Sequence, residues 1–585
     1  MNNFWKIFLG ALLGCLVALG LIFFIFIGSM GAAVAGSGSK AAVVPPQSIL
    51  KIDFSTPISE RGQSSFSLQN ISNVSLSGGM SLLNAVRAID KAATDPGVKF
   101  IYLNTDNMSM SISCTEELRQ ALARFRESGK PVIAYANTYN NVSYYLASVA
   151  DKVIVNTFGE AMLTGVGTQI TFFKDLLDKL GVDIQLIRHG KYKAAGEQFT
   201  QNHLTPENRE QNQVLVDGIW ASLTEEIAAS RDFSAEELDS WVDNLELLDA
   251  EGLKEKGLID EYWYKDELEN YLCTLFDVKE AKDLAFADLN SYYTAKVTAD
   301  TKAKDKIAVV YADGEIVMGG NEDSNIVGDQ LARRLQKLQQ DSSVKAVVFR
   351  VNSPGGSAQA AEIINHALLN LKAVKPVIAS YGDYAASGGY WISANADRIF
   401  TDKTTLTGSI GVFSLVPNIG GGLDKTLHIK TGSVGSNKHS DMMSGMRKLD
   451  DAEVAYMQKM VENIYTGFIS LVSEGRNMSV EEVDEIAQGR VWTGRDALTI
   501  GLADEKGSLT DAIAYAAAVA GLERYRLVVV PGQKSPLEQL RDQLMGGSSN
   551  DGVDIRTGIR QVDQLLDILD DPKMVYARMP YIYEF

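Results

Sequence analysis

Residues 383–391 of the chain read DYAASGGYW, a turn of small residues that follows the apolar segment 377–381 and leads into a helix. Ser387 lies in this turn, close to the backbone N–H groups that are unpaired at a helix start. A serine at such a junction can act as a nucleophile. It can equally serve only as a helix cap, which is a common role for serine at this place.

A second segment offers backbone donors. Residues 351–357 read VNSPGGS, and they stand between a predicted strand and a predicted helix. Gly355 and Gly356 allow the backbone to approach a ligand closely, with amide N–H groups at the helix N-terminus. Such a nest suits a phosphate or a developing oxyanion. A tight strand-to-helix turn without any ligand is the alternative, and no G-K-[ST] follows that would make the segment a P-loop.

A nucleophilic serine needs a base, and histidine is disfavoured here. The five histidines lie in no recognisable triad pattern, and the chain has no G-x-S-x-G segment. A lysine could act instead if its amine were neutral, which requires lowering its pKa from ~10.4 to near 7 at a cost of roughly 4.6 kcal/mol. Burial can supply that shift. Lys193 lies beside small residues in HGKYKAA (189–195), after the apolar segment 184–187, although a solvated lysine is the alternative.

Composition excludes several classes of protein. With 45% hydrophobic and 22% charged residues, the chain of 585 residues has the composition of an ordinary globular protein and not that of a disordered chain. The net charge of −19 argues against nucleic-acid binding. Cys15, Cys114 and Cys273 form neither a disulfide framework nor a C-x-x-C zinc pair. We therefore expect no metal site, no cofactor and no nucleic-acid partner.

The start of the chain predicts a membrane anchor. Residues 7–27 contain no charged side chain, and about 20 apolar residues in a helix cross the ~30 Å hydrocarbon core. The apolar region of a cleaved signal peptide is usually shorter, about 7–15 residues. We expect a transmembrane helix within residues 1–30 and a stalk over residues 31–48, which is rich in Gly, Ala and Ser up to Ser39. Lys6 before the span favours a cytoplasmic N-terminus.

An internal repeat predicts two related domains. Similar segments recur at a steady offset of 243–246 residues, such as KPVIA at 130–134 and again at 375–379. Short apolar strands alternate with amphipathic helices, which is typical of βαβ units and a mainly parallel sheet. We therefore predict an α/β chain with tandem domains at 49–295 and 296–535, joined through a charged segment at 277–306, and a C-terminal tail at 536–585. The tail ends with MVYARMPYIYEF, which is apolar enough to pack against another part of the protein.

Together these segments resemble the signal peptide peptidase A (protease IV) family in its long, double-domain form. The resemblance implies that Ser387 of A-S-G-G-Y is the nucleophile and that Lys193 of G-x-Y-K is the general base. It also implies that Ser409 of T-G-S-I-G holds this lysine. The S-P-G-G segment implies an oxyanion hole formed chiefly by the Gly356 N–H group, beside Gly355. Further implications are ClpP/crotonase-like domains and a bowl-shaped homotetramer.

The repeat gives a separate argument that the site is composite. Val142 stands at the position in the first half that corresponds to Ser387, and NTDN at 104–107 replaces the Pro-Gly-Gly turn. The second half has GSNK at 435–438 about where the Gly-Lys-Tyr-Lys pattern should recur. Each half keeps what the other has lost. We therefore expect one site per chain, with Lys193 reaching Ser387 across a domain interface.

These expectations combine into a membrane-anchored serine endopeptidase with a Ser/Lys dyad that degrades cleaved signal peptides at the cytoplasmic membrane. Its catalytic part would lie on the periplasmic side of a single-pass protein. Its partners would be the membrane, remnant signal peptides and other unfolded apolar peptides, aligned beside residues 355–356 by β-augmentation. A crotonase-like acyl-transfer enzyme and a catalytically inactive membrane scaffold are the alternatives.

Overall fold

The structure is a computed structural model, and it describes Phe8, Gly14 and residues 44–62, 64–70, 73–320, 322, 324–532, 575–581 and 583, without the side chains of residues 64–78. The predicted anchor lies outside the described residues except for Phe8 and Gly14, and so do most of the predicted stalk and tail. In the part of the chain that is described, no helix has both the length and the apolar character needed to cross a membrane.

The first half is built around a parallel sheet with the strand order β10-β8-β7-β6-β1-β11. Its central strands are almost continuously apolar and buried, as expected where helices cover both faces. The strands are β1 (Ser48–Ile52), β6 (Val98–Asn104), β7 (Val132–Asn140), β8 (Lys152–Met162), β10 (Glu261–Tyr262) and β11 (Phe286–Asp288).

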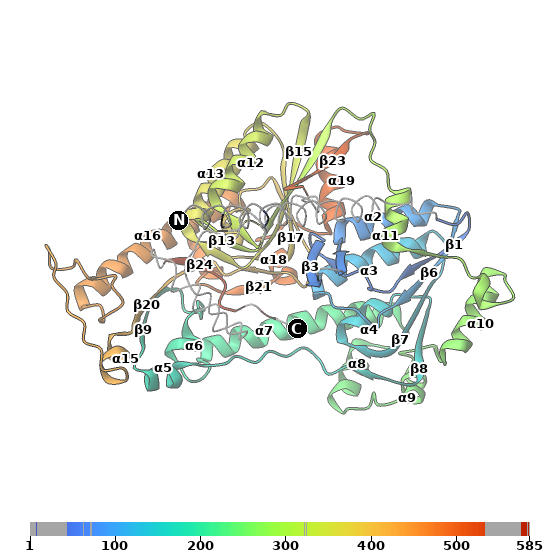
Figure 1. The fold of residues 1–585 in the computed structure, drawn as a ribbon, viewed down its shortest axis with the longest axis horizontal. Coiled ribbons are helices and arrows are strands. Elements are labelled where there is room, and N and C mark those ends of the chain that lie inside the picture. Colours follow the sequence, from blue (N-terminus) through green and yellow to red (C-terminus); the bar gives the residue numbers. More distant parts are fainter. Residues whose placement is uncertain are drawn as a thin grey trace.

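The second half repeats this topology. The path β22-β18-β17-β15-β12-β23 follows the order of the first sheet strand for strand, and β19 and β21 extend the sheet beyond β17. The tandem α/β arrangement predicted from the repeat is therefore present (Figure 1). The strands are β12 (Lys306–Asp313), β15 (Val344–Ser353), β17 (Val377–Ala386), β18 (Arg398–Thr401), β19 (Leu406–Gly408), β21 (Val491–Thr493), β22 (Glu505–Lys506) and β23 (Arg526–Val530).

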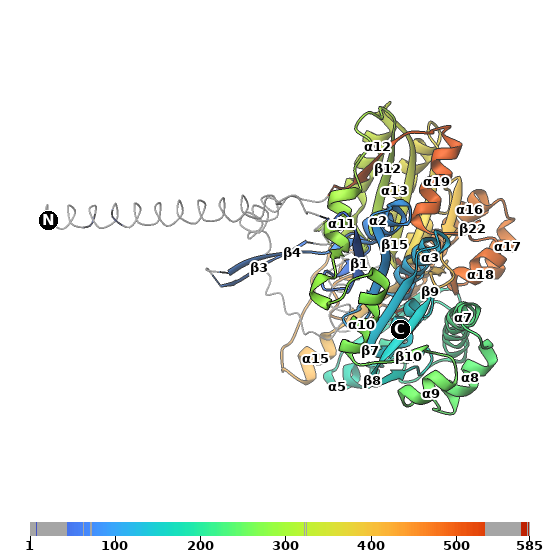
Figure 2. The same ribbon diagram turned by 90° about the vertical axis from the view of Figure 1, so that its right-hand side faces the viewer.

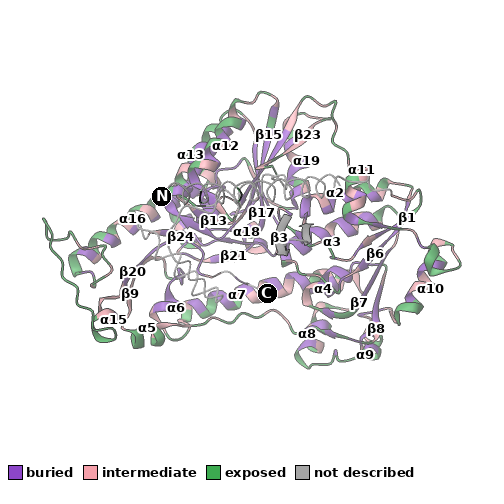
Figure 3. Ribbon diagram, viewed as in Figure 1, coloured by how far each residue is buried: buried purple, intermediate pink, exposed green. Residues whose placement is uncertain are grey.

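Helices surround both sheets, and their inward faces are buried (Figure 3). The long helix α7 contacts α4 and α8 of the first half as well as β21 and α18 of the second. The helices of the first half are α2 (Leu82–Thr94), α3 (Ile112–Glu127), α4 (Asn141–Ala147), α5 (Lys174–Leu180), α6 (Glu197–Thr200), α7 (Pro206–Ser230), α8 (Ala235–Asp243), α9 (Ala250–Glu255), α10 (Lys265–Phe276) and α11 (Leu289–Lys296). Those of the second half are α12 (Gly328–Gln340), α13 (Ala358–Lys372), α14 (Gly388–Trp391), α15 (Gly420–Lys425), α16 (Asp451–Arg476), α17 (Val480–Ile486), α18 (Gly494–Thr499) and α19 (Leu509–Val519).

A third sheet joins the two halves and the end of the chain. Its order is β14-β13-β16-β24-β20-β9. Strand β9 of the first half pairs antiparallel with β20 of the second over seven positions, from Asp183 opposite Asn418 to His189 opposite Val412. Its strands are β9 (Asp183–His189), β13 (Glu315–Val317), β14 (Asn325–Val327), β16 (Gly355–Ser357), β20 (Val412–Asn418) and β24 (Tyr576–Arg578).

Two details differ from a simple pair of domains. The segment 277–306, expected only to join the halves, contributes β11 and α11 to the first half because Ala287 and Tyr292 are buried there. Near the start of the first half, β3 (Ser64–Asn70) and β4 (Asn73–Gly78) form a hairpin that projects from the body of the molecule (Figure 2). Short strands β2 (Ile58–Ser59) and β5 (Met80–Ser81) pair at its base.

A buried ion cluster fastens the halves together. Arg350 on β15 is fully buried, and its Nε atom lies 2.6 Å from Oε1 of Glu60. Its Nη2 atom lies 2.6 Å from Oε1 of Glu117 on α3. Both carboxylates belong to the first half and the guanidinium to the second. Because buried charges are tolerated only when paired, this cluster favours one docked arrangement of the halves.

We expect the substitution Arg350→Met to lower the free energy of unfolding by about 3–5 kcal/mol, because it leaves Glu60 and Glu117 buried without their counter-ion. Chemical denaturation measures this change. The control is Arg495→Met, which removes another ion pair between the halves, the exposed contact of Arg495 with Glu225 at 2.7 Å. The control should lower stability by less than about 1 kcal/mol. Equal effects of the two substitutions would contradict the assignment of the buried cluster.

Candidate active site

Ser387 lies where β17 ends and α14 begins, as the sequence predicts. Its backbone has φ +54° and ψ −114°, a conformation that costs a non-glycine residue about 1–3 kcal/mol and persists only where its surroundings hold it. The Ser387 N–H group donates to the Gly408 carbonyl at 2.7 Å, and the Ser387 carbonyl accepts from Trp391 N–H at 2.8 Å. The residue is fully buried.

Lys193 follows β9 and reaches this serine from the other half of the chain. Its Nζ atom lies 2.9 Å from Oγ of Ser387 and 3.0 Å from both Oγ and the carbonyl oxygen of Ser409. The pairing of β9 with β20 explains this approach, because β20 begins three residues after Ser409. The structure therefore brings Lys193 to two serines that lie 194 and 216 residues away in the sequence.

The surroundings of Lys193 favour the neutral amine. The side chain is completely buried, and burial lowers the pKa of Lys193 well below its ordinary value. Its three hydrogen-bond partners are uncharged oxygen atoms, so they do not stabilise the ammonium form as a carboxylate would. A neutral amine at this distance can accept the hydroxyl proton of Ser387.

Two glycines make room for Lys193: Gly411, which ends the T-G-S-I-G segment, and Gly489, which lies in no segment that the sequence indicated. A Cβ atom on Gly489 would lie 2.6 Å from the Cβ atom of Lys193, and one on Gly411 would lie 3.2 Å from its Cδ atom. The carbonyl of Gln488 also accepts from the N–H group of Tyr192 at 2.9 Å. Gly489 belongs to no catalytic pattern, so only the folded arrangement reveals its role.

Ser409 is held beside the lysine in a second strained conformation, with φ +48°. Its N–H group donates to the Arg490 carbonyl at 2.6 Å. Its hydroxyl lies against Lys193, as described above. The position of Ser409 is thus consistent with orienting the amine, which is the role that the family resemblance implies.

The glycines of the S-P-G-G segment lie next to Ser387. Gly355 has φ +102° and Gly356 has φ +152°, in a region that strongly favours glycine. A Cβ atom on Gly355 would lie 2.8 Å from the nitrogen of Gly388, and one on Gly388 would lie 3.2 Å from the nitrogen of Gly356. The amides of Gly356 and Gly388 are therefore neighbours. Gly388 was absent from the predicted site, although the residue after a nucleophile in such a turn commonly donates its N–H group.

The counterpart of this site in the first half lacks its chemistry. Val142 lies in the first turn of α4, directly after β7, as Ser387 lies directly before α14 and after β17. Strand β6 corresponds to β15, but β6 ends at Asn104, whereas β15 is followed by Gly355 and Gly356.

The five predicted residues, Ser387, Lys193, Ser409, Gly355 and Gly356, therefore lie together in the structure.

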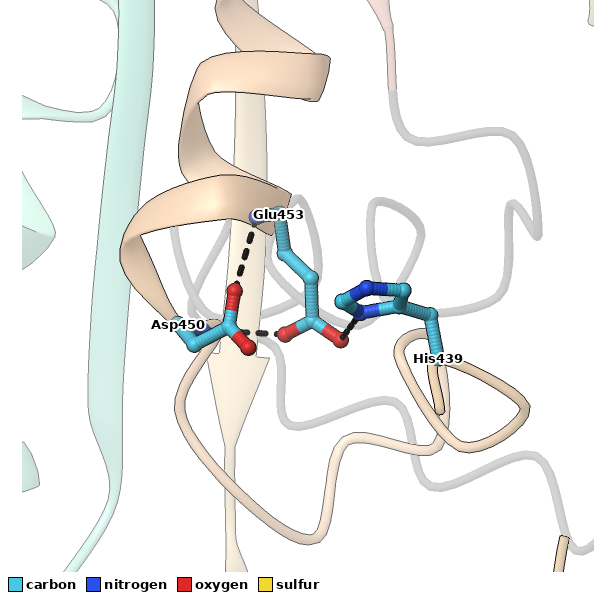
Figure 4. A group of neighbouring side chains, drawn as sticks. All are labelled: His439, Asp450 and Glu453. Atoms are coloured by element: carbon cyan, nitrogen blue, oxygen red, sulfur yellow. Dashed lines mark hydrogen bonds and ion pairs between the residues drawn. The ribbon is translucent and has the colours of Figure 1, made fainter. Parts of the chain in front are cut away.

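A group of side chains elsewhere has the composition of a metal site: His439, Asp450 and Glu453 (Figure 4). Its contacts give each residue another role. Asp450 caps α16 by accepting from the N–H group of Glu453 at 2.9 Å. The Glu453 carboxylate accepts from Arg447 at 2.7 and 2.8 Å and contacts Nδ1 of His439 at 2.8 Å. These contacts hold the pKa of Glu453 far below its usual range, chiefly through Arg447. The group is accounted for as a helix cap.

Known proteins resemble this chain in both of its halves. The model of "Peptidase family S49" matches residues 124–279 and 370–523, one stretch in each half. The chain is 34% identical to "Protease 4" of Haemophilus influenzae, over 74% of this chain and 72% of that protein. It is 32% identical to "Serine protease SPPA, chloroplastic" of Arabidopsis thaliana, over 89% of this chain and 76% of that protein. It is also 34% identical to "Putative signal peptide peptidase SppA" of Enterococcus faecium, over 40% and 72%.

A ClpP1 mutant from Listeria monocytogenes matches 35% of this chain with 16% identity and a TM-score of 0.24, which is too low to carry an argument about the fold. The ClpP/crotonase name for the two domains therefore stays a prediction. The family match has one stretch in each half, and the relatives from Haemophilus influenzae and Arabidopsis thaliana match 74% and 89% of this chain. The chain belongs to peptidase family S49 and is a serine peptidase.

Proposed function

We propose that Ser387 and Lys193 form the catalytic dyad of this peptidase. The observation that carries the proposal is the 2.9 Å contact between Oγ of Ser387 and Nζ of a completely buried Lys193. A buried lysine without an acidic partner is costly to maintain in a folded protein, and its use as a neutral base accounts for it. Membership of a peptidase family argues against the crotonase-like and scaffold alternatives.

The proposed reaction proceeds in two steps. In the first step, Lys193 takes the hydroxyl proton of Ser387 as Oγ attacks the peptide carbonyl carbon, and the amine then passes this proton to the leaving nitrogen. The N–H groups of Gly356 and Gly388 receive the oxyanion, a contact typically worth ~2.7–4 kcal/mol for each donor. In the second step, a water molecule activated by Lys193 hydrolyses the acyl-enzyme. Ser409 positions the amine throughout.

We further propose that the substrates are cleaved signal peptides. The name of the Enterococcus faecium relative and the apolar segment 7–27 support this substrate class. The segment would anchor the chain in the cytoplasmic membrane, with the peptidase on the periplasmic side, as a single-pass protein. A homotetramer and the domain limits 49–295 and 296–535 also remain proposals, supported by the family resemblance and by the repeat.

The substitution Ser387→Ala should lower the rate of peptide hydrolysis by about 1,000-fold or more, because it removes the nucleophile and leaves only the binding groups. Steady-state hydrolysis of a Leu/Ala-rich peptide by the full chain in detergent measures this loss. The control is Ser414→Ala on β20, a buried serine whose hydroxyl has no hydrogen-bond partner in the part of the chain that is described. Hydrolysis within tenfold of wild type by Ser387→Ala would refute the nucleophile.

Lys193→Arg should be as inactive as Lys193→Met, because a guanidinium remains protonated and cannot accept the serine proton. In the wild type, the active form has the neutral amine, so activity should rise with pH and be lost as the pH falls through the lowered pKa of Lys193. The pH profile of kcat/KM tests this expectation. The control is Lys191→Arg, at an exposed position two residues away, which should keep its activity. A profile set by a group near 6.5 would instead indicate histidine.

Substrate preference tests the signal-peptide proposal separately from the dyad. The full chain in detergent should cleave a Leu/Ala-rich peptide faster than an acidic peptide, and it should turn over a folded protein slowly. The physical reason is that a buried site admits only an unfolded segment with small or apolar side chains. Cleavage products are identified by mass spectrometry. Equal cleavage of the three substrates would refute this substrate class even if Ser387 proved to be the nucleophile.

A further inference from the structure

A strand from the end of the chain lies in the proposed active site. Strand β24 pairs antiparallel with β16 on one side, where Gly356 stands opposite Ala577. On its other side it pairs with β20, where Tyr576 stands opposite Phe413. Strand β24 therefore fills the position between β16 and β20 in the third sheet (Figure 1). This is the position in which the sequence analysis expected an extended substrate.

The carbonyl group of Ala577 lies at the glycines of the proposed oxyanion hole. The N–H group of Met579 donates to the Pro354 carbonyl at 2.7 Å, and hydrogen-bonded pairs alternate along an antiparallel ladder. Gly356 and Ala577 therefore form the next hydrogen-bonded pair. A Cβ atom on Gly355 would lie 2.2 Å from the Ala577 oxygen, and one on Gly388 would lie 3.0 Å from it. The oxygen thus lies against the two neighbouring amides beside Ser387.

The chain is held on both sides of the bond between Ala577 and Arg578. Before this bond, the ring of Tyr576 stacks on Phe413 with centroids 5.6 Å apart. After it, Nη1 of Arg578 lies 3.0 Å from Oε1 of Glu315.

Two further contacts lie beyond Arg578. The hydroxyl of Tyr581 accepts from Nδ2 of Asn208 at 2.7 Å, and Tyr384 donates its hydroxyl to the carbonyl of Tyr583. Binding on both sides of one peptide bond is what a substrate requires, whereas a bound product is held on one side only.

Ala577 also suits the position before a cut. Its side chain is completely buried, so only a small residue fits there. The small methyl group agrees with the preference for small or apolar residues that the proposed function requires.

We propose that the enzyme cuts its own chain between Ala577 and Arg578, an inference that rests on the proposed function. Oγ of Ser387 forms a bond to the carbonyl carbon of Ala577 while Lys193 takes the hydroxyl proton. The C–N bond to Arg578 then breaks, and its nitrogen receives that proton and leaves as an amine. Water hydrolyses the ester, so Ala577 gains a carboxylate and Ser387 regains its proton. An external peptide can bind between β16 and β20 only after the strand has left.

Intact-mass measurement of the purified full chain tests this proposal. The wild-type chain should end at Ala577, whereas Ser387→Ala and Lys193→Met should retain the residues from Arg578 onward. The same samples are assayed on an external Leu/Ala-rich peptide. A wild-type chain that hydrolyses this peptide but keeps its tail would overturn self-cleavage and leave the proposed function standing. Loss of both activities would overturn both proposals.

Two further variants test the assigned bond. Ala577→Phe should slow the cut at this bond at least about tenfold, because a ring cannot replace the buried methyl group without a clash. The matched control is Ala518→Phe, at an exposed position of α19, which should be cut as fast as wild type. Truncation after Ala577 in the Ser387→Ala chain would show that another protease makes the cut and would overturn the proposal.

Discussion

The antiparallel pairing of β9 with β20 is the contact on which the rest of the site depends. It is a backbone contact between the two halves, and it extends over seven residue pairs. Lys193 follows the end of β9 by four residues, and Ser409 precedes the start of β20 by three. The pairing therefore fixes the distance between the lysine of one half and the serines of the other. The buried cluster of Arg350, Glu60 and Glu117 is a second contact between the halves and supports the same docking.

The site is locally unfavourable, and the two folded cores sustain it. Burial destabilises the charged form of Lys193 and lowers its pKa well below that of an ordinary lysine. Ser387 and Ser409 add strained backbone conformations of about 1–3 kcal/mol each. The burial of apolar side chains in the two cores can offset these costs, because the strands on either side of the site are continuously buried. The same desolvation that makes Lys193 costly also makes it a base, so the instability and the proposed chemistry have one cause.

Local patterns predicted the parts of the site that are local. The small-residue turn around Ser387 and the glycines 355–356 are properties of short segments, and each lies between a strand and a helix as expected. The glycines also form a short strand of their own, β16, which was not predicted. Contacts between segments that are distant in the chain leave no recognisable pattern in the sequence. Gly489 is required because Lys193 packs on it and because its φ is +77°. Strand β24 joins the third sheet far from its neighbours in sequence. The predicted anchor lies almost wholly outside the described residues and so remains a prediction.

The shared topology of the halves explains why the site is composite. Each half has a strand that ends at a helix start in the place of Ser387, but the first half has Val142 there. The first half instead supplies β9 and the lysine that follows it. An isolated half would thus hold either a nucleophile without a base or a base without a nucleophile. Residues of the second half, such as Ser409 and Gly489, pack on Lys193, so its burial and its lowered pKa also depend on docking. A separated first half would expose this lysine to water, where it would stay protonated and could not act as a base.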